Sequence, residues 1–181
     1  MSTFGTAFVV DVPAVASQRV GTALAGVEAD VDATPLEDGL VRLAGYSDDV
    51  EAPGQVVEAV LSGLEGARAV LAEDFDEYGA RFRVLVVEAG LVRVVYQAYV
   101  LNADPGDADE VEAALGDHDQ DPRTEDLTGP GPARAAAEVF GVDPQAMVEA
   151  DRTYPSTAWE QIGAVGGPFP WWDALRLDWP G

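Results

Sequence analysis

The chain of 181 residues contains neither cysteine nor lysine. The absence of cysteine excludes disulfides, thiolate zinc sites and cysteine nucleophiles, and it favours a cytoplasmic location. The opening segment MSTFGTAFVVDVP has neither the basic stretch nor the apolar run of a secretory signal. No window reaches the roughly 18 uninterrupted apolar residues of a membrane span. We therefore expect a cytoplasmic protein that does not enter the membrane.

Positive charge is also scarce, because ten arginines stand against 33 acidic residues and the formal net charge is −23. A field of this sign repels nucleic-acid backbones and anionic membranes, so neither is an expected partner. It attracts cationic proteins and speeds their encounter. A second explanation stays open. A lysine-free chain rich in alanine, valine, glycine and arginine also fits a bacterial genome of high GC content or a salt-adapted proteome that is acidic throughout.

Composition and length predict one folded domain in three parts, since 48% of the residues are hydrophobic. Residues 1–101 carry the strand-like runs and read as a sheet with helices. Residues 102–132 are rich in Asp, Gly and Pro and read as an acidic connecting loop. Residues 133–181 read as a helical part that contains all four tryptophans. The predicted class is α+β, with a central antiparallel sheet, packed helices and a helical, Trp-rich C-terminal part.

The clearest predicted element is a β-hairpin over residues 81–101, the core of the expected sheet. Two β-branched and aromatic runs flank Glu88–Leu91, where Gly90 can adopt the positive φ of a tight turn. On the second arm one predicted face is wholly apolar and the other mixed, so we expect both arms to lie centrally in the sheet. The apolar face comprises Val92, Val94, Tyr96, Ala98 and Val100.

Other segments give weaker predictions. Strands are expected at residues 4–12 and 39–46, and a helix opens at Pro53 with an apolar stripe at helical spacing. Residues 67–79 fit a helix or a strand. Further helices are expected at 14–24, 107–115, 132–140 and 143–151, with Gly141 ending the third of these.

The segment GDHDQDPRTED, residues 116–126, holds the only histidine of the chain within a row of aspartates. Counted from Asp117, its acids stand at positions one, three, five and nine, which is the ligand spacing of an EF-hand loop. These acids are Asp117, Asp119, Asp121 and Glu125. However, Pro122 replaces the glycine of the sharp turn, and Thr128 replaces the bidentate glutamate. We therefore expect no metal site and no cofactor here. The weak metal candidates are Asp117, His118, Asp119 and Asp121.

Catalytic motifs are missing from the sequence. It has no Gly-x-Ser-x-Gly elbow, no phosphate loop and no second histidine to complete a metal triad. The run EDFDE, Glu73–Glu77, could hold a pair of catalytic carboxylates, but a charge run is typical of a solvated face. The sequence therefore favours a protein that is not an enzyme.

The aromatic cluster near the C-terminus admits two interpretations. Large rings bury much area and often form a satellite core. Alternatively, an aromatic patch rimmed by acids is the composition of a binding hot spot for a basic protein. The candidate interface residues on this second interpretation are Trp159, Phe169, Trp171, Trp172 and Trp179, together with Asp117, Asp119 and Asp121 of the acidic segment.

Taken together, these features predict a non-enzymatic, acidic protein-interaction domain that binds a basic partner. In size, acidity and lack of catalytic residues it resembles immunity proteins that neutralise bacterial toxins, a likeness of composition without a shared motif. Two alternatives remain. One is a metal-dependent hydrolase that uses aspartates around His118, and the other is a structural domain whose acidity is shared by its whole proteome.

Overall fold

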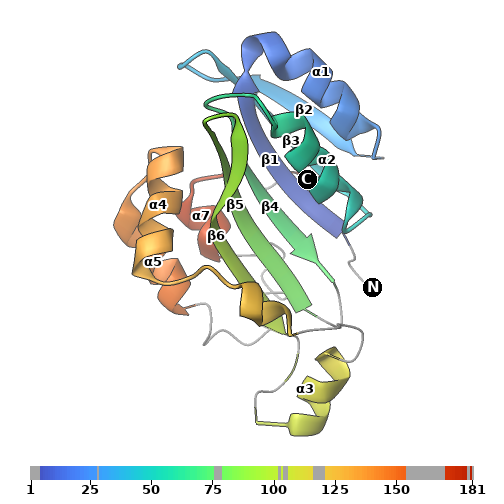
Figure 1. The fold of residues 1–181 in the computed structure, drawn as a ribbon, viewed down its shortest axis with the longest axis vertical. Coiled ribbons are helices and arrows are strands. Elements are labelled where there is room, and N and C mark those ends of the chain that lie inside the picture. Colours follow the sequence, from blue (N-terminus) through green and yellow to red (C-terminus); the bar gives the residue numbers. More distant parts are fainter. Residues whose placement is uncertain are drawn as a thin grey trace.

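The computed structural model describes residues 5–27, 29–75, 79–101, 103, 106–115, 121–153, 170–178 and 180. Its centre is a six-stranded antiparallel sheet with the strand order β2-β3-β1-β4-β5-β6 (Figure 1). The strands are β1 Gly5–Pro13, β2 Asp30–Pro35, β3 Leu40–Ser47, β4 Arg68–Asp74, β5 Gly79–Glu88 and β6 Leu91–Leu101.

Two helices, α1 (Ala14–Ala25) and α2 (Ala52–Leu61), cover one face of the sheet. Every second residue of β1, including Phe8 and Val10, points to this side and packs against Val20 and Leu24 of α1. Strands β1 to β4 with these helices follow a βαββαβ order, and β1 lies between β3 and β4 as in a split βαβ unit. The chain then adds β5 and β6 beside β4.

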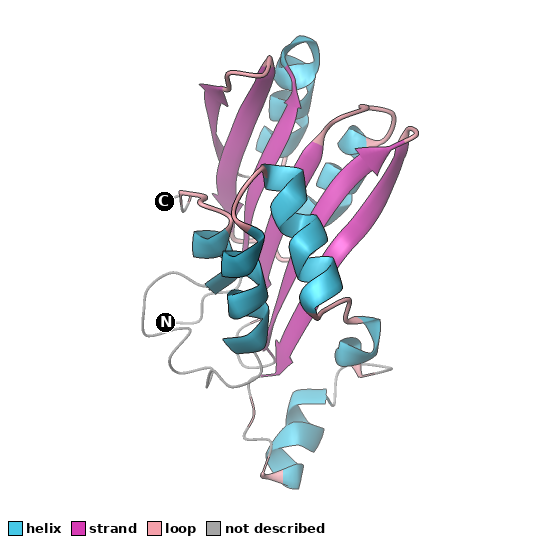
Figure 2. Cartoon of the chain, turned by 90° about the vertical axis from the view of Figure 1, so that its left-hand side faces the viewer, coloured by secondary structure: helices cyan, strands magenta, loops and turns pink. Residues whose placement is uncertain are grey.

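Three helices from the C-terminal part cover the other face: α4 (Pro130–Phe140), α5 (Pro144–Thr153) and α7 (Pro170–Ala174). Figure 2 shows them in front of the sheet. The alternate residues of the strands, such as Val9 and Phe82, meet small alanines of α4 and the ring of Trp171. Phe82 and Trp171 stack with their centroids 4.9 Å apart. The central strands of the sheet are therefore buried between two helical layers.

Between β6 and α4 the chain forms α3 (Ala108–Leu115), which projects from one end of the molecule, and the short 3-10 helix η2 (Pro122–Glu125). The expected acidic connection thus contains two helical segments. Among the described residues, no helix combines the length and apolar character needed to cross a membrane.

The α+β class and several elements are confirmed. The hairpin turns at Ala89 and Gly90, both of which have positive φ, and β1, β3, α1, α3, α4 and α5 lie where strands and helices were expected. Pro53 stands in the first turn of α2, and Gly141 ends α4 in the left-handed conformation with φ of 67°. Local chemistry at element ends therefore determined these boundaries.

Two expectations about the hairpin were wrong. Strand β6 is an edge strand and does not lie centrally. Its predicted apolar face also breaks, because the register with β5 shifts between Val84 and Leu85. Tyr96, Ala98 and Val100 face the C-terminal helices, whereas Val92 packs on the α1–α2 side. A β-bulge of this kind inverts the alternation beyond it.

Candidate functional site

A cleft of about 440 Å³ lies between the N-terminal turn of α2 and η2, over the end of the sheet. Strands β4 to β6 form its floor and the two helical segments form its walls. The floor residues are Glu73, Phe75, Arg81, Arg83 and Tyr99. The wall residues are Glu51, Gln55 and Glu58 on the α2 side, and Asp121, Pro122, Thr124 and Glu125 on the η2 side.

Sheet register brings the polar floor together. Thr6, Glu73, Arg81 and Tyr99 are successive Cα partners across β1, β4, β5 and β6. Directly paired residues place their side chains on the same face of a sheet. The face that is apolar under α1 and α2 therefore becomes polar at this end, and the side chains there meet although they are far apart in sequence.

Glu73 is the centre of the floor and is 0% exposed. Arg81 donates to its carboxylate through Nε at 2.7 Å and Nη2 at 2.9 Å. Arg83 donates through Nε at 3.0 Å and Nη2 at 2.7 Å, and its Nη1 donates to Glu58 of α2 at 2.6 Å. Each carboxylate oxygen of Glu73 thus accepts two charge-assisted bonds, which fixes both guanidinium groups in bidentate geometry.

Helix α2 approaches this group closely because position 54 is glycine. A Cβ there would lie 2.7 Å from Arg83 Nη2 and 3.0 Å from Glu73 Oε1. Gly54 is buried within the first turn of α2, immediately after Pro53. The small residue therefore sets the distance between the α2 wall and the floor of the cleft.

Two aromatic rings complete the floor. The Phe75 and Tyr99 centroids are 5.8 Å apart, and the Arg81 guanidinium lies 5.7 Å from the Phe75 centroid. Burial raises the pKa of Tyr99 to about 12, so its phenol is neutral at physiological pH. Burial lowers the pKa of Arg81, but hydrogen bonds to Glu73 and the charge of that carboxylate more than offset this effect and leave it raised.

The opposite wall is attached to the outer edge of β6. Gln97 and Leu127 exchange backbone hydrogen bonds of 3.1 and 2.7 Å in an isolated antiparallel bridge. Tyr99 N–H donates to Asp126 Oδ1 at 2.8 Å. Asp121 caps η2 by accepting from Arg123 N–H at 2.9 Å, and it also pairs with the Arg123 guanidinium. These bonds hold the wall residues 121–125 beside the floor.

The charge of the lining is unequal: five carboxylates face two arginines. Both arginines already bind carboxylates of the cleft, Glu73 and Glu58. A second, shallower depression of about 530 Å³ lies next to the cleft and shares Glu51 and Gln55 with it. Its other lining residues are Asp48, Asp49, Val50 and Ala52. The arrangement can therefore accept cationic groups along a continuous acidic surface.

A second buried carboxylate lies on the opposite face of the sheet. Asp11 is 0% exposed, and its cross-strand neighbours are Arg42 of β3 and Arg68 of β4. Arg42 donates through Nε and Nη2, each at 2.8 Å, and Arg68 through Nε at 2.8 Å. Arg68 also donates to the carbonyl of Val139 in α4 at 2.7 Å and lies over the ring of Phe140. This group joins α4 to the sheet.

The structure brings one residue of the predicted acidic site, Asp121, to the cleft. Asp117, His118 and Asp119 lie outside the described residues, as do the aromatic candidates Trp159, Phe169 and Trp179. Trp171 and Trp172 are 0% and 2% exposed and belong to the core against α4, α5 and the sheet. Within the described ranges, no group of His, Asp and Glu residues is arranged to hold a metal ion.

The importance of Glu73 was missed, because EDFDE was interpreted as a solvated face. Glu73 is instead fully buried, since two arginines satisfy its carboxylate. The signal was present in β5, where Arg81 and Arg83 alternate with the buried Phe82 and Val84. Two arginines on one face of a predicted internal strand require a buried acidic partner on a neighbouring strand.

Comparison of the chain with models of protein families, with curated proteins and with solved structures finds no match.

Proposed function

We propose that the chain is a non-enzymatic, acidic domain that binds a basic protein, in an immunity-type or regulatory role in the cytoplasm. The observation that carries the proposal is the cleft between α2 and η2. Its lining has an excess of carboxylates, and its two arginines are already bound to Glu73 and Glu58. Arg123 offsets the charge of Asp121, and Glu51 and Glu125 supply the remaining negative charge of the rim that an incoming cation meets.

Binding proceeds in two physical stages. The field of the net charge of −23 steers a basic protein toward the surface, an effect that salt screens. At the cleft, guanidinium or ammonium groups of the partner reach the exposed Glu51 and Glu125 at the rim. The rings of Phe75 and Tyr99 add an apolar and cation-attracting surface at the floor.

The state of Glu73 supports binding over acid–base catalysis. A general base needs an acceptor that is available to a substrate proton. Both oxygens of Glu73 are occupied by arginine donors, and its side chain is 1% exposed. The central carboxylate is therefore suited to positioning the floor.

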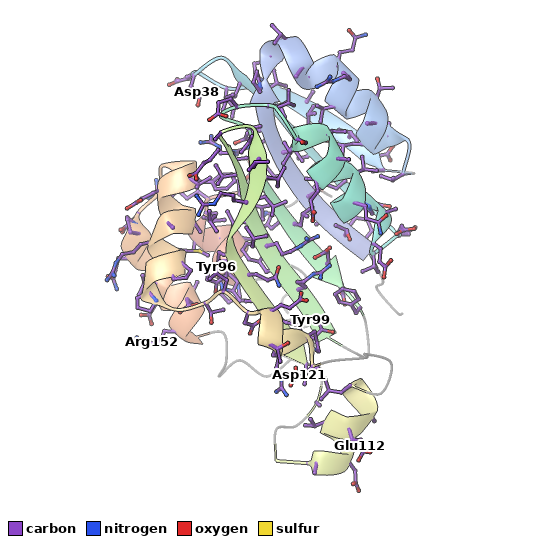
Figure 3. The ribbon with its side chains drawn as sticks, in the orientation of Figure 1. Asp38, Tyr96, Tyr99, Glu112, Asp121 and Arg152 are labelled. Carbon is purple, nitrogen blue, oxygen red and sulfur yellow. The ribbon has the colours of Figure 1, made fainter. Side chains whose placement is uncertain are left out.

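The test uses a nonameric arginine peptide and stopped-flow or surface-based kinetics at 50 and 300 mM salt. The cleft variant is Glu51→Gln/Glu125→Gln. The matched control is Glu37→Gln/Glu112→Gln, which removes the same charge from exposed residues outside the cleft lining. Figure 3 shows Asp38, the neighbour of Glu37, at the opposite end of the molecule from Asp121, whereas Glu112 lies on α3 at the same end as Asp121.

Both variants should slow association equally, because steering depends on net charge. Only the cleft variant should dissociate faster, by about three- to tenfold, because it loses contacts made in the complex. Equal dissociation rates for the two variants would contradict a specific binding site in the cleft. They would favour the alternative in which the acidity of the chain is shared by its whole proteome.

A further inference from the structure

The η2 wall of the cleft is fastened to the sheet by a small set of polar contacts. Residues 121–127 are bonded to β6 through the Gln97–Leu127 bridge, the Tyr99 N–H to Asp126 bond and a 3.1 Å bond from Gln97 Nε2 to the carbonyl of Glu125. None of the residues of η2 is buried, and Leu127 is 41% exposed. The segment thus lacks the apolar anchoring that stabilises the helices around it.

A segment held by edge hydrogen bonds without buried apolar side chains opens locally at low free-energy cost. Opening of residues 121–127 would remove Asp121 and Glu125 from the cleft and release the Gln97 and Tyr99 N–H groups at the edge of β6. The shape and charge of the cleft therefore depend on whether this segment is attached.

Asp126 is the charged residue at the attachment point. Burial, the largest influence, raises its pKa to about 6, and the charge of Asp121 adds to this. The Tyr99 N–H bond and the Arg123 charge act in the opposite direction. From β6, Tyr96 also lies within electrostatic reach, because the Asp126 carboxylate contributes to raising the Tyr96 pKa. The attached segment thus favours the neutral acid relative to a solvated aspartate.

We propose that residues Asp121–Leu127 form a latch over the edge of β6, and that neutralisation of Asp126 closes this latch and completes the cation-binding cleft. The statement that closure completes a cation-binding cleft rests on the proposed function. A raised pKa in the closed state means that the added stability of closure is fully present below the ordinary aspartate value and is lost as pH rises through about 6. A neutral carboxyl still accepts the Tyr99 N–H through its carbonyl oxygen.

This coupling gives binding an unusual pH dependence. A site made of ordinary carboxylates loses affinity for cations as pH falls, because the acids become neutral. Here Asp126 becomes neutral as pH falls through about 6, so a larger fraction of the protein is closed. The arginine peptide should therefore bind more tightly at pH 5.5 than at pH 7.5, in proportion to the closed fraction.

The first experiment measures the latch without a ligand. Amide hydrogen exchange at Tyr99 and Leu127, corrected for the intrinsic rate, should show an opening constant that falls about tenfold from pH 7.5 to pH 5. Asp126→Asn should remove this dependence. Asp32→Asn, a matched change at an exposed residue of β2, should retain it. An opening constant that is independent of pH in the wild type, or one that stays pH-dependent in Asp126→Asn, overturns the latch.

The second experiment locks the latch with an engineered disulfide. The chain has no cysteine of its own, so no other thiol competes for the pairing. Gln97 and Leu127 are a hydrogen-bonded antiparallel pair, for which a Cα separation of roughly 5.5 Å is within disulfide range. Oxidised Gln97→Cys/Leu127→Cys should bind the peptide at pH 7.5 as tightly as the wild type does at pH 5.5. Reduction should restore the wild-type pH dependence.

The outcomes separate the two proposals. Loss of binding in the oxidised variant, with recovery on reduction, would show that the latch must open to admit a ligand and would overturn the inference. A second outcome is that the peptide shows no cleft-dependent binding at either pH, while amide hydrogen exchange still depends on pH. That outcome would reject the proposed function and the completion of a cation-binding cleft. It would leave the pH-controlled closure of the latch supported.

Discussion

The buried carboxylates of Asp11 and Glu73, each 0% exposed, each bind two arginines on opposite faces of one sheet. They differ in the further partners that those arginines bind. The arginines on Asp11 come from β3 and β4, on either side of its strand, whereas both of those on Glu73 come from β5. Around Asp11, the remaining donor capacity of Arg68 goes to the Val139 carbonyl of α4. Around Glu73, Arg83 reaches Glu58 at the wall of a cleft.

The difference separates a structural role from a functional one. At Asp11 one of the two arginines, Arg68, also binds the C-terminal end of α4, so the ion pairs tie a helix to the sheet. At Glu73 the same chemistry forms a rigid floor that remains open to solvent on one side, beside Phe75 and Tyr99. Four of the ten arginines are used on these two acids, which leaves the rest of the molecule more acidic than its net charge indicates.

The largest expected effect comes from removing either carboxylate. Asp11→Ala and Glu73→Ala each leave two arginines without their buried partner, so each should lower the free energy of unfolding by about 3–5 kcal/mol. Urea denaturation followed by circular dichroism measures both. A loss below about 1 kcal/mol for Glu73→Ala alone would show that its arginines reach solvent through the cleft, and the two groups would then differ in stability as well as in role.

A smaller effect on stability is expected from replacing glycines in α1 and α2, the two helices that cover the Glu73 face of the sheet. Gly54→Ala places a Cβ 2.7 Å from Arg83 Nη2, so it should destabilise the protein by about 1–3 kcal/mol. Gly21→Ala in α1 is the matched control, because the nearest atom to its Cβ is Leu43 Cδ2 at 3.9 Å. Improved helix propensity should then stabilise the protein by up to about 1 kcal/mol. Thermal melts of the two variants should therefore shift in opposite directions.

The fold could be predicted wherever one local pattern determined the structure. The hairpin, α2 after Pro53 and the end of α4 at Gly141 are of this kind. Strand β4 was ambiguous because both of its faces are buried, so its apolar run has no alternation to distinguish it from a helix. Strand β2 was missed because it is an exposed edge strand with the polar sequence DVDATP, and pairing with β3 alone defines it.

The candidate site was harder to predict because it depends on register. Nothing in the spacing of Glu73, Arg81 and Tyr99 along the chain shows that they are cross-strand partners. The conspicuous segment 116–126 contributed part of a wall, through Asp121 to Glu125. The conspicuous tryptophans Trp171 and Trp172 became core, as large rings beside an alanine-rich helix usually do.

The smallest expected effect distinguishes the roles of the two groups most directly. Each has an arginine over a phenylalanine ring, Arg68 over Phe140 at 5.0 Å and Arg81 over Phe75 at 5.7 Å. Phe140→Leu should cost about 1 kcal/mol of stability through lost packing and cation–π contact, and should leave binding of the arginine peptide unchanged. Phe75→Leu should cost about half as much and should weaken peptide binding by several-fold, because that ring faces the cleft. Calorimetric titration beside a urea melt for each variant measures both quantities. Because the two substitutions are chemically identical, equal effects on binding would mean that the cleft floor has no binding role that the Asp11 group lacks.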